Sequence, residues 1–199
     1  MSNVLAEKWS VTKPTVESSG GVVTSQHYLA SEVGARVLAE GGNAIDAAVA
    51  TSFALGVVEP WMSGLGGCAF MVTYSAAQDK TYVLESGVRA PLAVDPADYP
   101  LSTGFDSDLF SWPGVFDNRN VMGPWSVAVP GLVAGLDAVV ERFATWGWHD
   151  LIAPAIDLAE QGLRVDWYSS LKIASAAGDL SRFPSSKALF LPDGQAPVG

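Results

Sequence analysis

The sequence is poor in the residues that most often bind metals or form disulfides. It has one cysteine, Cys68, and two histidines, His27 and His149, among its 199 residues. A single cysteine excludes a disulfide within the chain. A zinc site usually takes four nitrogen or sulfur ligands that lie close together, whereas these three residues are far apart in the sequence. We therefore expect no metal.

Basic residues and long apolar runs are also scarce. The chain has 11 lysines and arginines against 21 acidic residues, a formal net charge of −10. Such a surface repels nucleic-acid phosphates and anionic lipid, so we expect neither a nucleic acid nor a membrane as partner.

The most apolar stretch, Ala47–Val58, is far shorter than the roughly 20 residues that span a bilayer. No secretory signal is predicted at the N-terminus. The expected location is the cytoplasm, with the periplasm or secretion as alternatives if a leader was removed.

The chain is rich in apolar residues (49%), glycine (20) and proline (12). This content excludes disorder, and the length suits one sizeable domain. Residues 1–19 are polar and are expected to form an N-terminal arm, with one domain over residues 20–199. Strands and helices follow one another around a hairpin, which predicts a layered fold of the mixed α/β or the α+β class.

Two helices are predicted near the start of that domain. After a short strand at Val22–Thr24, a helix capped by Ser31 should run to about Glu40 and stop at Gly41-Gly42. Asn43 then caps a helix over Ala44–Val58, with Asp46 in its first turn. This second helix is apolar nearly all round, as expected for a buried helix. We expect its burial to need more protein than its immediate neighbours supply.

The remaining elements are less regular. Residues 87–124 should form a long irregular excursion, and the tail 181–199 should be rich in turns. The other predicted elements are a hairpin of Cys68–Ser75 and Thr81–Glu85, a strand at Trp125–Val129, and helices over 132–145, 151–161 and 167–177.

Residue chemistry alone does not complete an active site. The glycine-rich loop with Ser63, Gly64, Gly66 and Gly67 lacks the Lys-Ser/Thr of a phosphate-binding loop and leads into a strand. It is either a tight strand entry or a source of accessible backbone amides. The carboxylate pairs Asp106/Asp108 and Glu40/Asp46 are expected to be solvated, and no Gly-x-Ser-x-Gly elbow is present.

One basic residue stands out, because Arg89 lies just past a predicted strand on a surface with few cations. Its planar guanidinium suits a carboxylate ligand. The alternative from chemistry alone is a salt bridge to Glu85 or to another nearby acid.

The order of the motifs resembles the γ-glutamyltransferase (γ-glutamyltranspeptidase) family of N-terminal nucleophile hydrolases. The similarity runs in order from about Gly20 to Gly199. The matching segments are Leu38–Ala50 (LAEGGNAIDAAVA), Glu59-Pro60, Ser63–Met71 (SGLGGCAFM), Arg89–Pro91 (RAP), Val129–Leu136 (VPGLVAGL), Ala153–Ile156 (APAI) and Leu158–Gly162 (LAEQG).

The resemblance implies an αββα sandwich and a proenzyme that cuts itself into two subunits. The small subunit would carry a threonine nucleophile whose own α-amine acts as base, so no cofactor is implied. No catalytic residue is expected in this chain, which resembles the N-terminal part of the large subunit and should be inactive alone. The implied function is γ-glutamyl transfer from, or hydrolysis of, glutathione and related amides. The alternatives are an amidohydrolase or acylase acting on another amide, and a non-catalytic ligand-binding or interaction domain.

The resemblance also bears on individual site residues. The family's substrate arginine usually lies in Arg-Glu-x-Ala-Pro, where it pairs with the donor's α-carboxylate. Here Gly87 has that position and Arg89 follows two residues later. Either Arg89 substitutes from a shifted loop or the substrate differs. The glycine-rich loop, with Ser63, is expected to be structural first and to line the cleft between subunits second.

Overall fold

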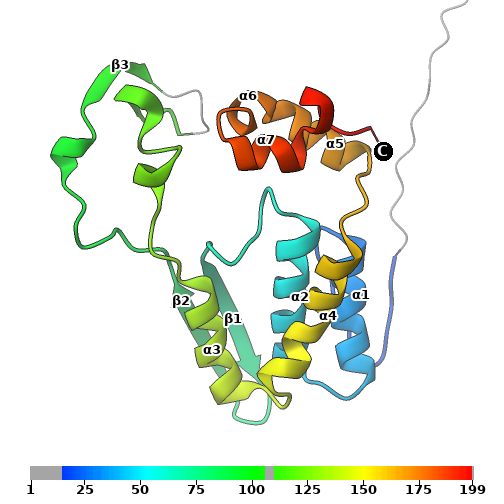
Figure 1. Ribbon diagram of the computed structural model, residues 1–199. Coiled ribbons are helices and arrows are strands. Elements are labelled where there is room, and N and C mark those ends of the chain that lie inside the picture. Colours follow the sequence, from blue (N-terminus) through cyan, green and yellow to red (C-terminus); the bar gives the residue numbers. More distant parts are fainter. Residues whose placement is uncertain (1–14, 106–109, 199) are drawn as a thin grey trace, which may run out of the picture.

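The computed structural model describes residues 15–105 and 110–198. The described part of the chain is α+β, as expected (Figure 1). The helices are α1 (Tyr28–Ala39), α2 (Ala44–Val58), α3 (Leu132–Phe143), α4 (Trp148–Gln161), α5 (Trp167–Ser175), α6 (Ala177–Leu180) and α7 (Pro184–Phe190). The strands are β1 (Ala69–Ser75), β2 (Lys80–Ser86), β3 (Leu101–Phe105) and β4 (Pro113–Val115).

Local signals account for the start of the chain, with two corrections. The cap of α1 is His27, whose Nδ1 accepts from the Leu29 amide, and not Ser31. Ser31 lies inside the first turn, where its hydroxyl bonds that of Ser25 at 2.8 Å. Val22–Thr24 is not a strand, because in the described residues no neighbouring strand pairs with it. Most of the predicted arm lies outside the described residues, which begin at residue 15.

Helix α2 is the centre of the fold and has the predicted bounds. The Asn43 side chain accepts from the amides of Ile45 and Asp46, and Asp46 accepts from the Asn43 amide, which completes a capping box. Nine of its fifteen residues are buried. Helices α1, α3 and α4 all pack against α2 (Figure 1), but an open groove remains along Ala44, Ala48 and Ser52. The expectation that full burial of this helix needs additional protein therefore stays a prediction.

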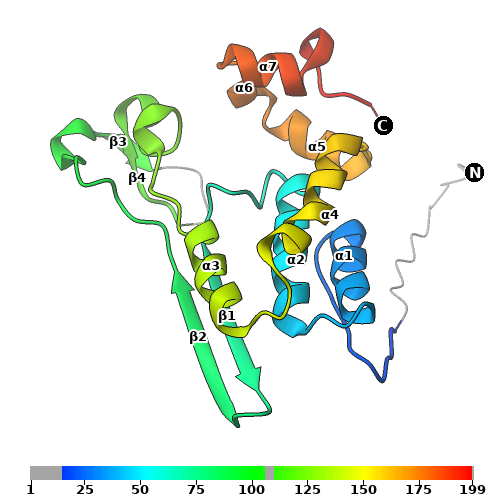
Figure 2. The ribbon, with the colours of Figure 1, turned by 60° about the horizontal axis from the view of Figure 1, so that its bottom comes forward.

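The β1–β2 hairpin lies on one side of α3 (Figure 2). The antiparallel register runs from Ala69 opposite Ser86 to Ser75 opposite Lys80, within one residue of the predicted bounds. Its inner face contributes Met71 and Leu84 to the core that α2, α3 and α4 share. Alternate residues of a strand point to opposite faces, so the hairpin has one packed face and one outer face.

The excursion and the tail contain more structure than the patterns predicted. Residues 87–124 hold the short β3–β4 pair and several 3-10 turns. The predicted strand Trp125–Val129 is wrong, since a turn occupies 124–126 and only Val129 makes a β-bridge. The turn-rich tail contains α7, which begins at Pro184, a residue suited to the first turn of a helix. In the described ranges no helix is long and apolar enough to cross a membrane.

Candidate functional site

A cleft of about 850 Å³ opens between the end of β2 and the start of α3. Its walls are residues 84–89 on one side and 129–131 on the other, with residues 134, 135 and 138 of α3 between them. The two walls are about 40 residues apart in sequence, and the long excursion connects them. No histidine, lysine or cysteine is among these lining residues, and Glu85 is the one carboxylate there.

Backbone hydrogen bonds hold the two walls together. The Arg89 amide donates to the Val129 carbonyl at 3.1 Å, and the Val129 amide donates to the Arg89 carbonyl at 2.8 Å. The amides of Gly131 and Leu132 both donate to the Gly67 carbonyl at 3.1 Å. The backbone at Arg89 is therefore anchored to α3 and to the end of the glycine-rich loop.

The walls meet where only glycine fits. A Cβ on Gly131 would lie 2.6 Å from the carbonyl oxygens of Ser86 and Gly87, closer than van der Waals contact allows. The Ser86 hydroxyl also donates to the Gly131 carbonyl. The glycine is required here by the close approach of two backbones, because its φ of −110° is accessible to any residue.

Arg89 lines the cleft, and its side chain is exposed. The alternative of a salt bridge to Glu85 is wrong, since no ion pair of Arg89 occurs among the described residues. Glu85 lines the same cleft, so the cleft contains one cationic and one anionic side chain that do not neutralise each other by direct contact.

The glycine-rich loop lies beside the cleft and not in its lining. Ser63, Gly64 and Gly66 are absent from the lining residues, and Gly67 contributes only its carbonyl to the anchor of α3. A Cβ on Gly64 or Gly66 would meet no atom of this chain within 4 Å. The prediction that these four residues line a cleft between subunits therefore stays a prediction.

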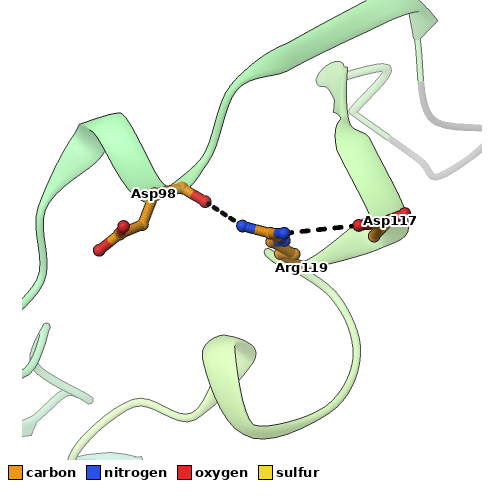
Figure 3. Close-up of polar contacts among 3 residues, drawn as sticks. All are labelled: Asp98, Asp117 and Arg119. Carbon is orange, nitrogen blue, oxygen red and sulfur yellow. Dashed lines mark hydrogen bonds and ion pairs between the residues drawn. The ribbon is translucent and has the colours of Figure 1, made fainter.

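A second arginine, which the sequence analysis did not single out, organises the excursion (Figure 3). Arg119 donates from its guanidinium to the Asp98 carbonyl at 3.2 Å and lies 3.5 Å from the Asp117 carboxylate. Asp117 and Asn118 both have positive φ, 60° and 52°, so one partner of the ion pair is itself part of this uncommon turn. No spacing signal predicts the contact, because Asp98 comes from the other end of the excursion.

The remaining candidate groups are not brought together. Cys68 is exposed, and His149 pairs with its neighbour Asp150 at 3.2 Å. No group of three metal-ligating side chains occurs among the described residues. Asp106 and Asp108 lie outside the described residues. In the other carboxylate pair Glu40 is exposed, but Asp46 is fully buried, so the expectation that this pair is solvated was wrong for Asp46.

Comparisons with known proteins agree on one family. A family model described as Gamma-glutamyltranspeptidase matches residues 30–199. A glutathione hydrolase proenzyme of Bacillus subtilis (strain 168) is 41% identical over 175 residues, which are 88% of this chain and 28% of that protein. An acylase ACY 1 proenzyme of Pseudomonas sp. (strain SE83) is 38% identical over 92% of this chain and 32% of that protein.

A solved structure shows the same fold. The γ-glutamyltranspeptidase of Helicobacter pylori has a TM-score of 0.77 and 33% identity, covering 92% of this chain and 51% of that one. The described residues thus correspond to one part of an N-terminal nucleophile hydrolase fold. The chain spans less than a third of the length of the two curated relatives.

Proposed function

This chain belongs to the γ-glutamyltranspeptidase family, and on that premise we propose that the complete protein is a self-processing amide hydrolase or acyltransferase. The chain contributes part of the large subunit, and a second subunit supplies a threonine nucleophile. The preferred donors are γ-glutamyl amides such as glutathione. The proposal is supported by the family match over residues 30–199.

The observation that carries the proposal is the position of Arg89. Its backbone is fixed by two hydrogen bonds to Val129, while its guanidinium stays unpaired in the cleft among the described residues. A planar guanidinium that makes no ion pair among the described residues suits a substrate carboxylate, which it can bind through two parallel hydrogen bonds. Arg89 therefore binds and orients the donor, and the nucleophile of the other subunit attacks the amide.

Glu85 adds a reason to favour γ-glutamyl donors. A γ-glutamyl group ends in an α-carboxylate and an α-ammonium, which need a cation and an anion respectively. The cleft has both, in Arg89 and Glu85. An acyl group that ends in a carboxylate alone would use Arg89 but would gain nothing from Glu85.

The test is steady-state kinetics of the complete, processed enzyme with γ-glutamyl p-nitroanilide. Loss of hydrogen bonds to a charged group costs about 1.5–3 kcal/mol, so Arg89→Ala should raise KM roughly 10- to 100-fold with a smaller change in kcat. Arg89→Lys should recover part of this loss. The matched control is Arg164→Ala, since Arg164 is exposed and lies outside the cleft. An unchanged KM for Arg89→Ala removes this residue from the site.

Two observations favour a second function. Gly87 stands where the family usually has its substrate arginine, and an acylase proenzyme is among the relatives. The second candidate is therefore an acylase whose acyl group ends in a carboxylate. Glutaryl p-nitroanilide lacks the α-ammonium and separates the two candidates. The γ-glutamyl assignment predicts that Glu85→Gln weakens γ-glutamyl turnover and leaves glutaryl turnover unchanged.

A further inference from the structure

Ser86 is the last residue of β2, and it lines the candidate cleft between the two charged residues of that cleft. Glu85 directly precedes it, and Arg89 follows three residues later. The side chains of Glu85 and Ser86 leave opposite faces of the strand, because alternate residues point to opposite sides of a sheet. Ser86 shares its face with Leu84, which packs against the core, so its side chain is directed at α3.

Two glycines at the start of α3 form a seat for the Ser86 side chain. Its hydroxyl donates to the Gly131 carbonyl, and a Cβ on Gly135 would overlap both the Cβ and the Oγ of Ser86. The two glycines are four residues apart, so they lie on the same side of the helix. The seat itself is fixed, since the Gly131 amide donates to the Gly67 carbonyl at 3.1 Å. Ser86 is therefore held both by its shape and by a hydrogen bond.

Arg89 has an anchor of its own. Its backbone exchanges two hydrogen bonds with Val129, at 3.1 and 2.8 Å, and neither of them involves Ser86. The loop between the two charged residues is therefore clamped at two points, by a side chain at 86 and by the backbone at 89. Because Glu85 is bonded covalently to Ser86, the first clamp determines where the Glu85 backbone lies, whereas the second determines where that of Arg89 lies.

We propose that Ser86 is a positioning residue that fixes Glu85 relative to Arg89, and so matches the cleft to a donor with an ammonium and a carboxylate on the same carbon atom. In such a donor the two charges are a fixed distance apart, so the anion and the cation that bind them must be held at a fixed spacing as well. Ser86 acts through Glu85 and has no contact of its own with the substrate. The inference rests on the proposed function and adds the residue that sets donor selectivity.

Ser86→Ala tests the proposal without disrupting α3. The Gly131 carbonyl keeps its bond from the Gly135 amide at 2.9 Å, so no acceptor loses its only partner, and the smaller side chain fits the same seat. In the complete, processed enzyme, KM for γ-glutamyl p-nitroanilide should rise about 2- to 10-fold, the range expected for one neutral hydrogen bond, with a smaller change in kcat. KM for glutaryl p-nitroanilide should not change, because that substrate has no α-ammonium for Glu85 to bind.

The matched control is Ser181→Ala, which removes the same kind of bond, from a serine hydroxyl to the Gly178 carbonyl at 2.7 Å, outside the cleft. It should leave both KM values unchanged. A wild-type KM for Ser86→Ala with the γ-glutamyl substrate overturns the proposal. An equal rise with both substrates also overturns it, because a general loosening of the cleft has no reason to spare glutaryl turnover.

A double-mutant cycle identifies the residue through which Ser86 acts. The effects of two residues on the free energy are additive when the residues act independently, and they are not additive when one acts through the other. In the Glu85→Gln background, Ser86→Ala should therefore leave KM for the γ-glutamyl substrate unchanged. In the Arg89→Ala background it should still raise KM about 2- to 10-fold. A further rise of KM in the Glu85→Gln background overturns the proposal.

Hydrogen exchange separates failure of this proposal from failure of the proposed function. Amides of residues 84–88 in the same enzyme should exchange about 2- to 10-fold faster in Ser86→Ala than in the wild type or in Ser181→Ala. Exchange at the wild-type rate overturns the anchor, whatever the kinetics show. An enzyme that turns over neither anilide contradicts the proposed function, and faster exchange at 84–88 would then still support the anchor.

Discussion

The buried carboxylate of Asp46 offers the sharpest test of how this fold is held together. Its Oδ1 accepts from the amides of Thr145 and Trp146 at 3.0 and 3.1 Å. Its Oδ2 accepts from the Asn43 amide at 2.7 Å and from the Thr145 hydroxyl at 2.5 Å. One side chain thus fixes the start of α2 to the turn between α3 and α4, about 100 residues further along the chain.

Asp46→Asn keeps the size of the side chain and removes half of this acceptor capacity. Whichever way the amide is oriented, its NH2 group faces at least one backbone N–H that then has no partner. An unsatisfied buried donor costs about 1–3 kcal/mol, and the loss of charge assistance adds about 1 kcal/mol. We expect the opening free energy of this region to fall by about 2–4 kcal/mol.

Amide hydrogen exchange of the complete protein measures this quantity at the turn itself. Peptides that cover residues 143–147 should exchange roughly 30- to 700-fold faster in Asp46→Asn. The matched control is Asp157→Asn on the exposed side of α4, which should change the opening free energy by less than about 0.5 kcal/mol. Exchange at the wild-type rate in Asp46→Asn would refute the assignment of this carboxylate as the link between α2 and the turn.

The same contact predicts a pH dependence with a defined sign. Burial by itself would raise the pKa of Asp46, but the hydrogen bonds from Thr145, Asn43 and Trp146 outweigh it and hold the pKa below its ordinary 3.8. A carboxyl whose pKa is lower in the folded state contributes stability above its unfolded pKa and loses it as pH falls through the folded value. The advantage of wild type over Asp46→Asn should therefore shrink below about pH 4.

Two further predictions concern the cleft and the excursion. Gly131→Ala should destabilise the protein by about 1–3 kcal/mol and raise KM, because the new methyl group would overlap the carbonyls at the end of β2. Thermal unfolding measures the first effect and steady-state kinetics the second. The control Gly178→Ala, whose methyl group would meet open space, should leave both nearly unchanged. Arg119→Ala should speed proteolysis between residues 95 and 125, because the Asp98 carbonyl loses its donor, whereas Arg164→Ala should leave the cleavage rate unchanged.

Elements with a complete local signal were predictable from the sequence. Asn43 and Asp46 start α2, and Gly162, with a φ of 80°, follows the end of α4. The hairpin was also found, because two β-branched and aromatic runs flank a short polar turn. These features depend on neighbours within a few residues, so a linear pattern contains nearly all of the required information.

The errors occurred where the decisive partner is distant or missing. Val22–Thr24 and Trp125–Val129 have the composition of strands, but a strand exists only when another strand offers hydrogen bonds to it. The cover that α3 and α4 give to α2 is not visible in the sequence of α2 itself, because both helices come much later in the chain. The outer face of the hairpin, whose residues are exposed, was not recognised because apolar residues on both faces of a strand look the same in sequence as an ordinary buried strand.

The sequence by itself determined the class of fold, the main helices, the hairpin and the family resemblance, because each is encoded in contiguous residues. Only the tertiary structure decided that Arg89 has no ion pair with Glu85, that Asp46 is a buried link and that residues 84–89 and 129–138 form one cleft. The link depends on the packing of α2 against the turn between α3 and α4, and the cleft depends on the packing of α3 against β2. Both bring together groups that the chain order separates by 40 residues or more.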